Sequence, residues 1–142
     1  MNGERSCIQM NINSEFQFAP LHDLHILAVE DDIVSAKYLE KILGKSGADS
    51  RITRDFEGMK KCCQDDFCPD VVLLDIALIG ANGFDCLKWL KEKFANRNVI
   101  YIAQTAHVLS DETLSYAEAG FDDFIGKPYK REELVNVVLA NL

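Results

Sequence analysis

The sequence lacks any apolar run close to the roughly 20 residues that a membrane-spanning helix needs, and its N-terminus has no charged start followed by an apolar signal-peptide core. Basic residues are also in deficit, with 15 Lys and Arg against 23 Asp and Glu and a formal net charge of −8. Nucleic acids and anionic membranes attract positive surfaces, so this balance argues against binding to either. We therefore expect a cytoplasmic protein with no direct nucleic-acid or membrane partner.

Cysteine occurs five times but never in a CxxC pair. Zinc sites usually draw paired ligands at such short spacings, and disulfides are rare in reducing compartments. We therefore interpret the cysteines as ordinary helix and loop residues.

The composition is that of one globular domain. The chain has 142 residues, of which 48% are hydrophobic and 27% charged, enough to build a single core. Residues 1–22 show no sustained periodicity, so we predict a tail or linker over residues 1–23 and the domain over residues 24–142. The alternative is that Phe16 and Phe18 pack an extra segment on the domain.

Short apolar runs alternate with segments of helical periodicity along the domain. Strands are predicted at residues 25–29, 50–53, 71–75, 99–103 and 123–126, and helices at residues 33–46, 55–64, 84–94, 110–119 and through the C-terminal stripe that ends at Leu142. Strands that alternate with helices form a parallel sheet with helices on both faces. We predict a doubly wound α/β fold with five strands in the order 2-1-3-4-5.

Carboxylates follow two of these strands. The run Val71–Asp75 places Asp75 at the carboxyl end of the central strand, and Glu30 and Asp31 follow the first strand. In the order 2-1-3-4-5 these two strands are neighbours, so their acids would converge. Unit charges about 4 Å apart repel by several kcal/mol at an effective dielectric near 20, and a cluster of oxygen ligands suits Mg²⁺ or Mn²⁺. The alternative is that Glu30, Asp31 and Asp32 are ordinary acids at a helix start.

Asp75 beside a divalent cation is the arrangement that forms an aspartyl phosphate. Phosphoryl transfer depends mainly on positioning and charge neutralisation. Lys127, after the fifth strand, would add a positive charge, and Thr105, after the fourth, a hydroxyl donor. Singly, Lys127 would be a surface lysine and Thr105 a strand-end cap, but their joint placement favours catalytic roles.

These motifs resemble the response regulator receiver domain of two-component signalling. The resemblance covers roughly residues 24–142 and rests on four features. They are Glu30-Asp31 after ILAV, the VVLLD end at Asp75 with a glycine-bearing loop, Thr105-Ala106, and Lys127-Pro128.

The resemblance implies a flavodoxin-like fold and transfer of a phosphoryl group to Asp75 from a histidine kinase or a histidine phosphotransfer domain. It implies Mg²⁺ held by Asp31, Asp75 and the backbone carbonyl of Ala77, with Glu30 assisting. Thr105 would turn toward the phosphoryl group and Phe124 would fill the space behind it. The Lys127–Pro128 bond would be cis.

The sequence departs from the family pattern in several places. Phe124 replaces a frequent tyrosine, Glu30 a common aspartate, and Ile79 a frequent proline. Ala77 and His107 occupy positions that set the lifetime of the phosphate in the family. We hypothesise that Ala77 gives no help to hydrolysis and that His107 adds pH sensitivity.

We expect a signalling switch rather than a turnover enzyme. Its output surface would comprise the helix, strand and terminal helix of residues 110–141, which would contact a downstream effector or a second copy in a homodimer. A phosphohydrolase would need a second acid where Ala77 stands, and a nucleotide-binding module would need a phosphate loop where three acids follow the first strand. A degenerate receiver is disfavoured because every acceptor-site residue is present. The chain ends after its last helix, so we expect a stand-alone receiver or one cut from a larger protein.

Overall fold

The computed structural model describes residues 19–77, 83–106 and 112–142. The predictions for Phe16, Phe18, Ile79 and His107 therefore lie outside the described residues.

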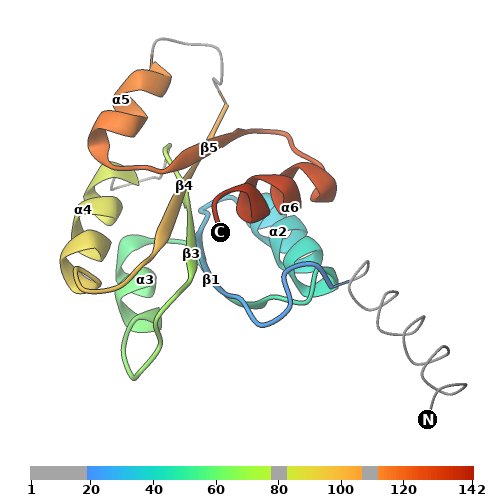
Figure 1. The fold of residues 1–142 in the computed structure, drawn as a ribbon, viewed down its shortest axis with the longest axis horizontal. Helices are drawn as coiled ribbons and strands as arrows, with labels where there is room; N and C mark the ends of the chain where they lie inside the picture. The colour runs from blue at the N-terminus through green and yellow to red at the C-terminus, as the bar shows by residue number, and fades with distance from the viewer. Residues whose placement is uncertain (1–18, 78–82, 107–111) are drawn as a thin grey trace, which may run out of the picture.

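Five parallel strands form one sheet in the order β2-β1-β3-β4-β5, as the alternating pattern predicts (Figure 1). Val29 pairs with Leu74 and Asp75 with Gln104, which aligns the carboxyl ends of the three central strands at one edge. The strands are β1 (His25–Val29), β2 (Asp49–Thr53), β3 (Val71–Asp75), β4 (Ile100–Thr105) and β5 (Asp123–Gly126).

Helices cover both faces of the sheet. Helices α2 and α6 lie on one face, and α3, α4 and α5 lie on the other (Figure 1). This arrangement confirms the doubly wound fold. The described helices are α2 (Ile33–Lys45), α3 (Phe56–Cys62), α4 (Gly83–Lys93), α5 (Glu112–Ala119) and α6 (Arg131–Ala140). Among these helices none is long and apolar enough to cross a membrane.

The period-2 alternation of the strands divides the core in two. Along β1, Ile26 and Ala28 pack toward α2 and α6, whereas Leu27 and Val29 pack toward α3 and α4. All of β3 is buried, as expected for a central strand of a parallel sheet covered on both faces.

Local signals set the ends of α2. The Asp32 carboxylate accepts a hydrogen bond from the Ser35 backbone N–H and caps the helix start. Gly47, just beyond the helix, has φ +86°, which glycine adopts without steric cost. Asp32 and Gly47 thus set the two ends of α2.

Strand β4 runs past its predicted end. The sequence predicts a strand over residues 99–103, whereas β4 continues to Thr105. The extension pairs Gln104 with Asp75 and Thr105 with Gly126. These ladder bonds outweigh the polar character of Gln104 and Thr105, which ended the apolar run.

The segment before β1 joins the core. The Leu21 side chain is fully buried, and its backbone N–H donates to the Ser46 carbonyl at 2.8 Å. Leu21 lies inside residues 1–23, which the sequence pattern assigns to a tail or linker. The apolar residues around Leu21 follow no sustained periodicity that would predict its burial.

Candidate functional site

The carboxyl edge of the sheet brings Glu30, Asp75 and Lys127 together. The Lys127 ammonium donates to the two Glu30 carboxylate oxygens at 2.8 and 2.9 Å and to Asp75 Oδ2 at 2.9 Å. Glu30 is 0% exposed and Asp75 7% exposed. Residues that are 97 and 52 positions apart in the chain therefore share one buried ionic cluster.

Asp31 completes this acidic site. One carboxylate oxygen from each of Glu30, Asp31 and Asp75 lies within 4.8 Å of the others. Lys127 contacts Glu30 and Asp75, and the Arg54 guanidinium donates to the Asp31 backbone carbonyl at 3.3 and 3.4 Å. When all three acids are ionised, their negative charge exceeds the positive charge of these two cations, and a divalent cation would offset the excess. The donors are all oxygen, which suits a hard cation such as Mg²⁺ or Mn²⁺. The residues therefore fit the predicted metal.

The two buried acids, Glu30 and Asp75, have pKa values shifted in opposite directions. Burial raises the pKa of Glu30 to about 7, and a hydrogen bond with Asp75 adds to this effect against the opposing charge of Lys127. Burial also works to raise the pKa of Asp75, but its hydrogen bonds with Glu30 and Lys127 outweigh burial and lower that pKa. Asp75 is thus the carboxylate that keeps its negative charge, as a nucleophile requires.

Two backbone segments lie close to Asp75, one at Ala77 and one at Gly83. The Ala77 backbone N–H donates to Asp75 Oδ1 at 3.0 Å. At the start of α4, a Cβ on Gly83 would lie 2.8 Å from the Asp75 carbonyl oxygen and 3.1 Å from Ile76 Cα. Gly83 therefore lets α4 approach the site closely. Sequence reasoning missed this role because a glycine-bearing loop after Asp75 does not indicate which backbone atoms will meet.

Thr105 ends β4 beside the site and pairs with an unpredicted partner. Its carbonyl accepts the Lys127 backbone N–H at 2.8 Å. Its side-chain hydroxyl lies 3.2 Å from the Tyr116 hydroxyl, and both residues are buried. Phe124, the predicted switch residue, is half-buried and packs against the core on the α4 side of the sheet. No sequence signal distinguishes Tyr116 from an ordinary core aromatic of a helix.

A second buried polar pair lies on the other face. The Tyr129 hydroxyl donates to Gln104 Oε1 at 2.7 Å, and the Lys127–Pro128 bond just before Tyr129 is cis, as the resemblance implies. Within the described residues, Gln104 Nε2 is a buried nitrogen without a hydrogen-bond partner.

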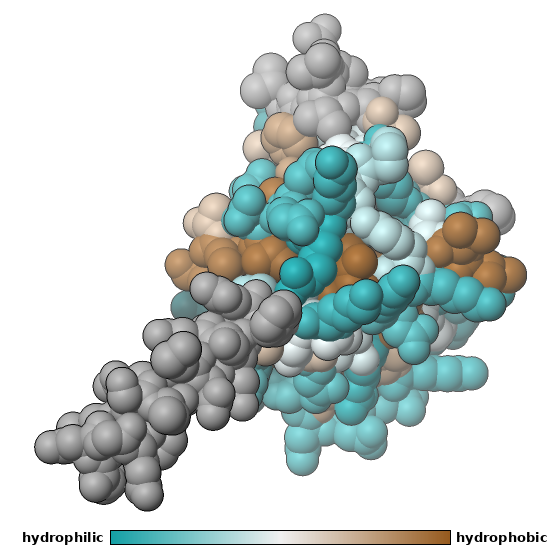
Figure 2. Space-filling view, turned by 90° about the vertical axis from the view of Figure 1, so that its right-hand side faces the viewer, coloured by the Kyte–Doolittle hydropathy of each residue, from teal (hydrophilic) through white to brown (hydrophobic). Residues whose placement is uncertain are grey.

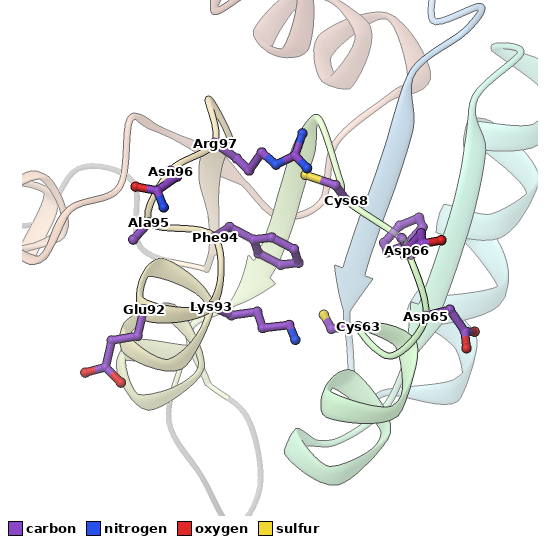
Figure 3. Close-up of a pocket in the computed structure, with 11 residues that line it drawn as sticks. Cys63, Asp65, Asp66, Cys68, Glu92, Lys93, Phe94, Ala95, Asn96 and Arg97 are labelled. Carbon is purple, nitrogen blue, oxygen red and sulfur yellow. The ribbon is translucent and has the colours of Figure 1, made fainter.

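A separate cavity of about 490 Å³ lies between the loops that follow α3 and α4. Lys93 and Arg97 extend into it beside Cys63 and Cys68 (Figure 3). Burial raises the pKa of the Cys63 thiol to about 11, so this thiol is protonated at neutral pH. The cavity contains none of the predicted site residues. Among the described residues, one group of three His, Cys, Asp or Glu side chains lies close enough to hold a metal ion together. That group is the acidic cluster of Glu30, Asp31 and Asp75.

Fold and site together define a doubly wound α/β domain with an acid-and-lysine cluster at the carboxyl edge of its parallel sheet. The family model for the response regulator receiver domain matches residues 26–139. The chain belongs to this family, and is a receiver domain of two-component signalling.

Known relatives agree with this assignment. The chain is 35% identical over 117 residues to the DNA-binding response regulator MtrA of Mycobacterium tuberculosis, covering 82% of this chain and 50% of MtrA. It therefore spans about half the length of that curated relative.

Two solved structures are similar. The receiver domain of sensor histidine kinase PA1611 from Pseudomonas aeruginosa is described with a magnesium ion in its active site cleft, and it matches with TM-score 0.72, 26% identity and coverage of 82% of this chain and 95% of that one. The chemotaxis response regulator CheY4 of Vibrio cholerae has the same fold, with TM-score 0.76, 18% identity and coverage of 84% and 98%.

Proposed function

We propose that this receiver domain accepts a phosphoryl group on Asp75 from a phosphohistidine of a kinase or phosphotransfer domain. One observation carries the proposal: Asp75 is a buried carboxylate with a lowered pKa, bonded to Lys127 and adjacent to two further acids. A purely structural ion pair would not need a third carboxylate at the same point.

The chain's own residues account for the transfer. An Asp75 carboxylate oxygen attacks phosphorus, the new P–O bond forms as the P–N bond to imidazole breaks, and the departing imidazole retains the bonding electron pair and takes a proton from solvent. The Lys127 ammonium, already 2.9 Å from Asp75, pairs with the charge on the phosphoryl oxygens. Thr105, at the end of the neighbouring strand, would donate its hydroxyl to the same oxygens.

The acidic cluster would hold Mg²⁺ or Mn²⁺ through Glu30, Asp31, Asp75 and the backbone carbonyl of Ala77. When bound, the cation neutralises charge on the transferring phosphoryl group. Without it, Lys127 pairs with Glu30 and Asp75, and Glu30 takes up a proton near neutral pH.

The phosphodonor would approach over the start of α2. Ile33 and Val34 follow the acids directly and are 49% and 75% exposed. Both are large apolar side chains. The face of the molecule drawn in Figure 2 is mainly hydrophilic, with apolar side chains gathered in a few patches. Exposed apolar groups beside a site favour a protein partner over a small molecule.

The phosphorylated domain would act as a signalling switch rather than as an enzyme with catalytic turnover. Ala77 has no acid to assist a leaving group, and Thr105 and Phe124 would transmit the new charge to a surface formed by α5, β5 and α6. Leu139 on α6 is 43% exposed, which suits contact with an effector or a second copy of the chain. The net charge of −8 favours a protein partner here, although MtrA as a whole is named as DNA-binding.

Intact-mass analysis tests the proposal. Incubation with acetyl phosphate and Mg²⁺ should add one phosphoryl group to the wild type and to Asp66→Asn, an exposed aspartate control, but none to Asp75→Asn. Equal modification of Asp75→Asn would overturn the proposal.

A further inference from the structure

Thr105 and Tyr116 form a buried hydroxyl pair that links the phosphoacceptor site to α5. The two oxygens are 3.2 Å apart, and the residues are 4% and 3% exposed. Thr105 ends the strand next to β3, and Tyr116 lies in the middle of α5. The contact therefore connects the reacting edge of the sheet with the helix next to it in the chain.

The Tyr116 ring packs against two other aromatic rings. Its centroid lies 6.0 Å from that of Phe84 and 6.4 Å from that of Phe121, and the Phe84 and Phe121 centroids are 6.1 Å apart. The Tyr116 carbonyl also accepts the Phe121 backbone N–H at 3.1 Å. Because Phe84 follows Gly83, which abuts the Asp75 backbone, this aromatic cluster is anchored at the site on one side and in α5 on the other.

A hydroxyl has a single hydrogen to donate. Either hydroxyl could be the donor in the resting pair. If the Thr105 hydroxyl turns to donate to a phosphoryl oxygen on Asp75, it can no longer donate to Tyr116. The change of its rotamer also moves its oxygen away from the Tyr116 hydroxyl, whichever of the two donates at rest. In a buried site the lost hydrogen bond disfavours that change. The resting partner of Thr105 thus competes with the phosphoryl group.

We propose that Tyr116 is a positioning residue that holds the Thr105 hydroxyl in the resting state, and that its release on phosphorylation is transmitted directly to α5. This inference rests on the proposed function of Asp75. It gives the chain a hydroxyl-based link that Phe124, which has no hydroxyl, does not provide. The perturbed element is α5, part of the proposed output surface.

Titration with beryllofluoride and Mg²⁺, followed by calorimetry, measures the competition. Beryllofluoride mimics the phosphoryl group on a carboxylate. Tyr116→Phe removes the competing hydroxyl and should tighten binding by about 3- to 10-fold, the range expected for one net hydrogen bond. Tyr101→Phe, which removes the hydroxyl of another buried tyrosine in β4, should leave the affinity unchanged.

A double-mutant cycle shows whether the effect passes through Thr105. In a Thr105→Val background, Tyr116→Phe should change the beryllofluoride affinity less than 2-fold. Unchanged or weaker binding by Tyr116→Phe alone, or an equal gain in both backgrounds, would overturn the inference. Loss of binding in Asp75→Asn checks the proposed function separately, and if the wild type itself binds no beryllofluoride, both proposals fall.

A second measurement, by NMR, keeps the inference testable if Tyr116→Phe fails to fold. Thr105→Val should shift the Tyr116 ring-carbon resonance next to the hydroxyl, measured by NMR in metal-free protein, and should speed exchange of the hydroxyl proton. Beryllofluoride with Mg²⁺ should move the wild-type resonance in the same direction. A resonance that neither change moves would overturn the inference.

Discussion

Glu30→Gln should remove most of a pH dependence of stability that the metal-free protein would otherwise show. Glu30 is fully buried, and its folded-state pKa of about 7 lies above the usual value of 4.5. The folded protein therefore holds a proton on Glu30 over a pH range in which the unfolded chain has released it. Glutamine keeps the shape of the side chain but does not titrate.

The size of the effect follows from proton linkage. Stability from this group is fully present below pH 4.5 and is lost as pH rises through 7, because unfolding then releases the proton. Each unit of pKa shift corresponds to about 1.4 kcal/mol, so the Glu30 contribution should fall by about 2–3 kcal/mol between about pH 5 and pH 8. The lowered pKa of Asp75 acts below this window and does not cancel the effect.

Urea unfolding at several pH values, with a chelator present, measures this difference. The wild type should lose about 2–3 kcal/mol more than Glu30→Gln between about pH 5 and pH 8, with equal m-values. Parallel pH profiles of the two proteins would refute the reasoning, because they would show that Glu30 is ionised throughout the folded state.

Three further predictions test other parts of the structure. Gly83→Ala should lower the free energy of unfolding by about 1–3 kcal/mol, because its Cβ would meet backbone atoms. The control is Gly44→Ala in α2, where an added Cβ meets nothing within 4 Å and should raise the free energy of unfolding by up to about 1 kcal/mol. Equal effects of the two substitutions in urea unfolding would contradict the close approach at Gly83. Leu21→Ala should cost about 2–5 kcal/mol in the same assay, and a loss below about 0.5 kcal/mol, the size typical of surface changes, would place Leu21 outside the core. Lys127→Met should slow phosphorylation by acetyl phosphate about 100-fold in a timed intact-mass assay, and an unchanged rate would remove Lys127 from the reaction.

Topology explains why much of the site could be predicted from the sequence. The carboxyl ends of parallel strands meet at one edge of the sheet. The acids at the ends of β1 and β3 and the lysine after β5 must therefore lie near one another once the strand order is known. The convergence of Glu30, Asp75 and Lys127 is therefore a consequence of alternating apolar runs and their terminal residues. The same alternation predicts the helices on both faces.

Contacts that depend on side-chain packing could not be predicted in this way. The pairing of Thr105 with Tyr116 joins a strand end to the middle of a helix, and periodicity says only that Tyr116 faces the core. The close approach at Gly83 and the burial of Leu21 likewise depend on how neighbouring elements meet in space. A single sequence contains no pattern that reports such distances.

The identity of the phosphorylated residue tests the central claim most directly. Protein treated with acetyl phosphate and Mg²⁺ is reduced with borohydride, which converts an aspartyl phosphate to homoserine, and is then digested and sequenced by tandem mass spectrometry. We predict homoserine at position 75 in the wild type and at no other aspartate. Homoserine at Asp31 or elsewhere, or its absence from position 75, would contradict the account.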